Sequence, residues 1–177
     1  MSLLLILLAL AVAVVLLLAA AKPGEFRVER ALRIQAPPEA LFAAINDLHR
    51  WPEWSPWERL DPAMRRSYDG APAGVGASYA WDGNNKAGAG RMQITESDPY
   101  NRIELRLDFL RPFTSCNRVE FTLQPVAELT ELRWSMTGPL PFVAKIMHVF
   151  VNMDAMIGRD FEAGLARLRA LAERRPG

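Results

Sequence analysis

Few side chains in this chain of 177 residues could do acid–base, nucleophilic or metal chemistry. Its only imidazoles are His49 and His148, and its only thiol is Cys116. The sequence contains no G-x-S-x-G, G-x-x-x-x-G-K-[ST] or H-E-x-x-H motif, which mark hydrolases, phosphate-binding loops and zinc peptidases. Zinc and iron sites need more His or Cys ligands than this chain offers. We therefore predict no catalytic residue, no metal and no cofactor.

Among the titratable residues of the apolar stretch near the C-terminus, Asp160 and His148 are the candidates for a functional role. Asp160 falls on the same helical face as Ile146 and Ile157, where a carboxylate needs a partner or a raised pKa. It could pair with an arginine to fix the helix, or it could hold the polar end of a ligand. His148 lies about 200° around the helix from Ile146, so we expect it at a rim rather than as an inward-facing base.

Rigid aromatic surface is concentrated in the segment WPEWSPW, residues 51–57, which holds three of the five tryptophans. Its prolines allow only short helical turns. Trp51, Trp54 and Trp57 could form a binding platform, a lid over a cavity, or part of a packed core. Each of the three roles remains open from the sequence.

Alternating polar and apolar residues predict the elements that would position these side chains. A first strand over 25–35 is followed by a helix over 36–47, whose prolines lie in its first turn. Further alternating segments occupy 76–82, 90–98, 102–109, 117–123 and 130–136. Short turn-rich links join them, so we predict an antiparallel meander with one apolar face.

The apolar face of this sheet needs a cover. Residues 139–175 carry apolar side chains at spacings of three and four, which predicts one long amphipathic helix across the sheet. Its stripe runs through Phe142, Ile146, Phe150, Met153, Ile157, Phe161, Gly164, Leu168 and Leu171.

The N-terminal segment from Ser2 to Ala21 has no charged residue and is long enough to cross a bilayer. We predict a transmembrane anchor over 1–22 and a folded domain over 23–177. A signal peptide is the alternative, because Ala19–Ala21 could be a cleavage site. Basic residues follow the span and none precedes it, so we expect the domain on the cytoplasmic side, in a single-pass membrane protein. The lone cysteine is consistent with that side of the membrane.

The order of these elements and three motifs resemble the START-like (SRPBCC) superfamily, in its polyketide cyclase/dehydrase branch. The motifs are NDLHRWPEWSPW after the first helix, the hairpin WDGNNKAGAGRMQITESDP, and the terminal helix GRDFEAGLARLRALAE. The resemblance covers roughly residues 26–172. It implies an α+β helix-grip fold, in which a curved antiparallel sheet wraps around a long C-terminal helix.

An apolar cavity between sheet and helix is what this resemblance implies. The inward positions predicted to line it are Trp54, Trp57, Tyr79, Trp81, Met92, Leu105, Leu107, Phe121, Trp134, Phe150, Met153, Ile157 and Asp160. The expected partner is a lipid or other hydrophobic small molecule. The net charge of +1, with both signs interspersed, gives no sign of a nucleic-acid groove. Oligomeric state is left open.

Two other functions are compatible with the same fold. One is an enzyme of the cyclase or dehydrase kind, which would need two polar groups within reach of one another. The other is an interaction module whose core is filled. Since no such polar pair is visible in the sequence, we favour binding without catalysis.

Overall fold

The chain forms an antiparallel sheet that is covered on one face by helices. The computed structural model describes residues 2–174. Its elements are α1 (Ser2–Ala20), β1 (Glu25–Ile34), α2 (Pro38–Asn46), the 3-10 helices η1 (Leu48–Glu53) and η2 (Pro56–Arg59), β2 (Arg65–Asp69), β3 (Ser78–Asp82), β4 (Ala89–Asp98), β5 (Arg102–Arg111), β6 (Ser115–Val126), β7 (Leu129–Pro139), α3 (Phe142–Phe150) and α4 (Met153–Ala172).

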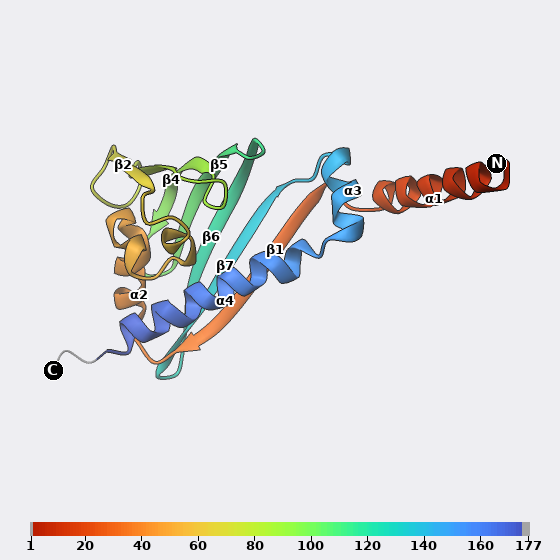
Figure 1. Ribbon diagram of the computed structural model, residues 1–177. Helices are drawn as coiled ribbons and strands as arrows, with labels where there is room; N and C mark the ends of the chain where they lie inside the picture. Colours follow the sequence, from red (N-terminus) through yellow and green to blue (C-terminus); the bar gives the residue numbers. More distant parts are fainter. Residues whose placement is uncertain (1, 175–177) are drawn as a thin grey trace.

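All seven strands belong to one sheet, in the order β1-β7-β6-β5-β4-β3-β2. Every neighbouring pair is antiparallel, and β1 closes the meander by pairing with β7 along its full length, from Glu25↔Pro139 to Ile34↔Thr130. Helix α4 crosses the inner face of this sheet, and α1 projects away from the domain (Figure 1). The predicted α+β helix-grip fold is confirmed.

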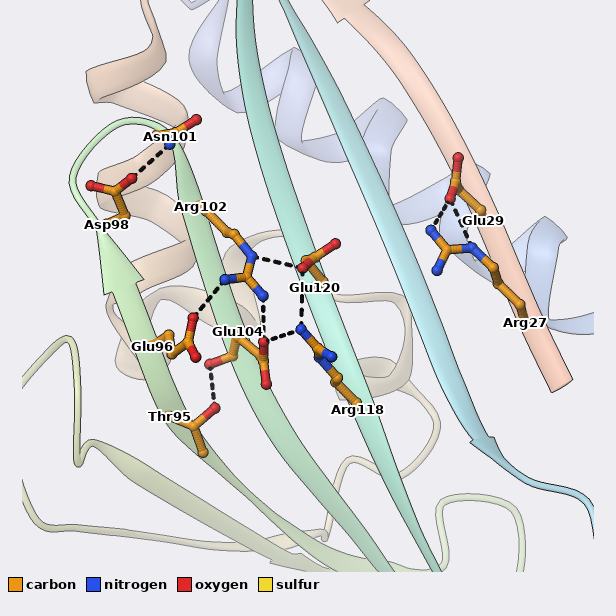
Figure 2. Close-up of polar contacts among 10 residues, drawn as sticks. All are labelled: Arg27, Glu29, Thr95, Glu96, Asp98, Asn101, Arg102, Glu104, Arg118 and Glu120. Atoms are coloured by element: carbon orange, nitrogen blue, oxygen red, sulfur yellow. Dashed lines mark hydrogen bonds and ion pairs between the residues drawn. The ribbon is translucent and has the colours of Figure 1, made fainter. Parts of the chain in front are cut away.

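The two faces of the sheet differ as the alternation predicts. On the outer face, the Arg102 guanidinium lies between Glu96, Glu104 and Glu120 at 2.5, 2.5 and 2.7 Å, and Arg118 binds Glu104 at 2.6 Å (Figure 2). Such exposed pairs stabilise a fold only slightly, but they keep this face hydrated. The apolar side chains of the strands therefore lie on the inner face.

The predicted single C-terminal helix is in fact two helices. Val151 adopts an extended conformation after α3, and the Asn152 side chain accepts a hydrogen bond of 3.0 Å from the backbone N–H of Ala155. Asn152 is thus the N-cap of α4. Because of this break, α3 and α4 run in different directions. The residues of one apolar stripe in the sequence therefore lie in two different environments.

An arginine on the inner face of β1 fastens α4 to the sheet. Arg30 binds Glu162 at 2.8 Å and Asp154 at 3.1 Å, and it reaches both by passing over Gly158. A Cβ at position 158 would lie 1.9 Å from the guanidinium of Arg30. Gly158 therefore leaves room for the guanidinium between α4 and β1, and a larger residue there would displace Arg30 from both carboxylates.

Helix α1 extends beyond the folded domain. Its residues Leu3–Ala20 have a mean hydropathy of 3.3, and only 6% of them are buried. This helix is long and apolar enough to cross a membrane.

Candidate ligand-binding region

The tryptophan-rich segment is part of a packed aromatic core. Trp54 is 0% exposed, and its indole N–H donates to the Ala44 carbonyl at 3.1 Å. The Trp51 indole donates to the Ile45 carbonyl at 2.9 Å. Both tryptophans are therefore fixed against α2, and they form neither a free platform nor a movable lid.

The cluster continues from this segment to the sheet and α4. Trp134 stacks on Phe161 with ring centroids 4.2 Å apart, while Trp57 meets Trp134 edge-on at 5.5 Å. Phe121 also contacts Trp134, at 4.9 Å. The space between the sheet and the C-terminal half of α4 is therefore filled by side chains.

The opposite end of the inner face is less completely covered. Helix α4 packs mainly on β1, η2 and α2, so the inward side chains of β3, β4 and β5 that lie furthest from these elements remain half-buried. These are Trp81, Met92 and Leu107. They lie at the edge of the core and not at its centre, which leaves this end of the sheet accessible.

A groove of about 570 Å³ lies where α3 meets α4 beside the beginning of β1. Its apolar lining comes from Phe26, Val28, Leu140, Val149 and Met153, among other residues. The polar part of the lining consists of Lys22, Glu25, Arg27, His148, Asn152 and Asp154. The volume is in the range of small-molecule sites, and the lining combines apolar side chains with charged and polar ones.

A buried polar cluster connects η2 to the sheet. The Tyr79 hydroxyl donates to Glu58 Oε1 at 2.6 Å, and Arg66 Nε donates to Glu58 Oε2 at 2.7 Å. Tyr79 and Glu58 are 3% and 8% exposed. Burial, aided by this hydrogen bond to Glu58, raises the pKa of Tyr79 well above its ordinary value of 10.0. The phenol thus remains protonated and serves as a hydrogen-bond donor.

Two buried side-chain atoms within residues 2–174 have no hydrogen-bond partner, Asn117 Oδ1 and Trp134 Nε1. Asn117 is 5% exposed and lies opposite Leu107 in the β5–β6 register, at the less covered end of the inner face. An unpaired polar atom in this environment is costly.

The structure divides the predicted lining residues into three groups. Trp54, Tyr79, Leu105, Phe121 and Trp134 are buried in the core. Trp57, Trp81, Met92, Leu107, Met153, Ile157 and Asp160 are half-buried, and Phe150 is 72% exposed. Only Phe150 and Met153 among them line the groove. Phe150 is more exposed than its predicted place on the inward stripe implies, because α3 ends at this residue.

Sequence reasoning overlooked Glu58, Arg66 and Asn117. Glu58 and Tyr79 are 21 positions apart, and no periodic pattern joins a 3-10 helix to a strand at that separation. The inward alternation of β6 at 117, 119, 121 and 123 could have placed Asn117 on the inner face. Asn152 could likewise have indicated the interruption of the C-terminal helix, because asparagine is favoured at N-caps.

Comparison with known protein families agrees with this architecture. Residues 25–173 match the model of the family described as polyketide cyclase / dehydrase and lipid transport. The chain belongs to this family. Its predicted membership of the START-like group is thereby confirmed. No match was found among curated proteins.

Several solved structures share the fold at low sequence identity. Protein CV1439 from Chromobacterium violaceum is 18% identical with a TM-score of 0.60, over 87% of this chain and all of that one. The Aha1 dimer from Colwellia psychrerythraea is 15% identical with a TM-score of 0.60, over 86% and 99% of the two chains. The di-domain aromatase/cyclase BexL of the BE-7585A biosynthetic pathway is 17% identical with a TM-score of 0.64, over 90% and 53%. This chain thus corresponds to about half of BexL.

Proposed function

We propose that this protein binds a lipid or other hydrophobic small molecule between its sheet and its C-terminal helices. The groove of about 570 Å³ at the α3–α4 junction is the observation that carries this proposal. Phe26 and Val28 on the inward side of β1 line it, and so do Lys22 and Pro23, which follow α1. The family description, which includes lipid transport, supports the same class of ligand.

Met153 provides a direct test of the groove. It is the first residue of α4 and lines the groove while remaining half-buried. In the full-length protein, Met153→Trp should fill the space and lower the affinity for an apolar fluorescent probe by roughly tenfold or more, with little change in melting temperature. Met156→Trp is the matched control, because Met156 is 44% exposed and lies one turn further along α4.

A loss of stability in Met153→Trp, together with no uptake of the probe by the wild-type protein, would overturn this proposal. If the site is solid, Met153→Trp should overpack it and cost about 1–3 kcal/mol, and the wild-type protein should take up no probe. If the wild-type protein does take up the probe, mass spectrometry of molecules that co-purify with the full-length protein would identify the chemical class of the natural ligand.

We further propose that α1 anchors the domain, residues 23–177, to the cytoplasmic face of a membrane. The support is the apolar length of α1 together with Lys22, Arg27, Arg30 and Arg33, which follow it. A reporter enzyme fused after Gly177 should be active in the cytoplasm, and the protein should remain in membranes after a carbonate wash. Recovery of a shortened form that begins at Lys22 would show instead that α1 is a cleaved signal peptide.

The cyclase or dehydrase alternative has one observation in its favour. Glu58 and Tyr79 form the kind of close polar pair that acid–base catalysis needs. Both groups are almost completely buried and hold η2 on β3, however, so a substrate could reach them only if η2 moved. Binding therefore remains the favoured function.

A further inference from the structure

Helix α3 presents its apolar side to the outside of the domain. Val143 and Phe150 are 73% and 72% exposed, and Met147 and Phe142 are 51% and 48% exposed. None of the nine residues of this helix is buried. A helix packed on a soluble domain normally turns its apolar stripe inward. In α3 this arrangement is reversed.

The polar side of α3 faces the chain that connects α1 to β1. Lys145 Nζ donates to the carbonyl of Lys22 at 2.9 Å. Nearby, the backbone N–H of Leu140, the residue that follows β7, donates to the Gly24 carbonyl at 2.7 Å. His148 is half-buried on the same side, where burial and the charge of Lys22 lower its pKa. The domain therefore uses the polar side of α3 for internal contacts and leaves the apolar side uncovered.

The position of α3 indicates what could cover that apolar side. Helix α3 packs against the end of α1, where Ala19 is 0% exposed (Figure 1). If α1 spans a bilayer, its last turn marks the boundary between the hydrocarbon and the headgroups. The contact with α1 then brings α3 to the depth at which amphipathic helices lie in a membrane.

We infer that α3 is an interfacial helix, whose apolar face inserts into the same bilayer that α1 spans. This inference rests on the proposed anchor and adds a second membrane contact to it. The face consists of Phe142, Val143, Met147 and Phe150. Helix α3 has no acidic residue, it carries Lys145, and Lys22 lies beside it, which suits anionic headgroups.

Membrane contact at α3 would also define the route of the ligand. Val149 and Phe150 at the end of α3 belong to the lining of the groove, together with Met153. With α3 in the headgroup layer, the groove opens directly at the bilayer surface. An apolar guest could then move between bilayer and groove without crossing water, which lowers the hydrophobic cost of transfer.

Site-specific fluorescence in lipid vesicles tests this arrangement. The full-length Cys116→Ser protein, in vesicles of phosphatidylcholine and phosphatidylglycerol, would carry a single NBD-labelled cysteine at position 143, 10 or 163. Leu10 lies within α1, and Ala163 is an exposed residue of α4. A spin-labelled lipid and aqueous iodide would then serve as the two quenchers.

We expect lipid-borne quenching at position 143 to exceed that at position 163 several-fold, with iodide quenching in the reverse order. Lipid quenching at position 10 but iodide quenching at position 143 would overturn the interfacial role of α3 and leave the anchor intact. Protection of position 143 from both quenchers would also overturn it, since a second copy of the chain would then cover α3. Iodide quenching at position 10 would show that the anchor itself fails.

Discussion

Phe161→Ala should lower the free energy of unfolding by about 3–5 kcal/mol, the usual cost of removing a fully buried aromatic ring. Phe161 is 1% exposed and stacks on Trp134 with an interplanar angle of 5°. Its removal leaves a hole between α4 and the sheet, which the rigid indoles of Trp57 and Trp134 cannot fill. Chemical denaturation of the full-length protein in detergent, followed by tryptophan fluorescence, would measure the loss.

Phe150→Ala is the matched control for this change. Both phenylalanines lie on the apolar stripe that the sequence shows, but Phe150 is 72% exposed. Its replacement in detergent should change the free energy of unfolding by less than about 0.5 kcal/mol. Equal losses for the two variants would contradict the division of the helix at Val151 and Asn152, because they would require Phe150 to be as buried as Phe161.

Glu58→Ala should cost about 3 kcal/mol, because it removes the acceptor of two hydrogen bonds in a buried site. The Tyr79 hydroxyl would lose its acceptor, and the Arg66 charge would lose its partner. The Arg66 side chain keeps 27% of its surface exposed, so water can compensate part of the lost interaction. We therefore place the cost near the lower end of the about 3–5 kcal/mol observed for broken buried pairs.

Glu53→Ala provides the comparison for Glu58. Glu53 ends the neighbouring helix η1 and pairs with Arg50, but its side chain is 43% exposed. Exposed ion pairs contribute about 0–1 kcal/mol, so thermal unfolding of this variant should resemble that of the wild type. A Glu58→Ala protein as stable as Glu53→Ala would show that the polar cluster does not hold η2 on the sheet.

The amino-acid sequence determined six of the seven strands, the two faces of the sheet and the apolar N-terminal helix, whereas β2 (Arg65–Asp69) was not predicted. Strand residues such as Leu105 and Phe121 were assigned to the inner face correctly, because successive side chains on a strand point to opposite sides. The charged residues between them, such as Glu104, were assigned to the outer face for the same reason. These properties depend on local spacing, so they can be predicted without knowledge of the fold.

Local spacing gave no information on how far each inward residue is from the surface. Trp134 and Leu107 both lie on the inner face, yet Trp134 is buried and Leu107 is only half-buried. The difference depends on where α4 crosses the sheet. That position is set by buried contacts between residues distant in the sequence, such as the stacking of Phe161 on Trp134.

The tertiary structure alone decided the surroundings of the C-terminal apolar stripe and of Glu58. An apolar helix face has the same periodicity of about 3.6 residues whether it packs on a protein core or on a bilayer. The stripe therefore could not show that Phe150 is exposed while Phe161 is buried. Glu58 and Tyr79 form a pair only because η2 folds back onto β3. Such contacts follow from the packing of whole elements, which is why they could not be predicted from the sequence.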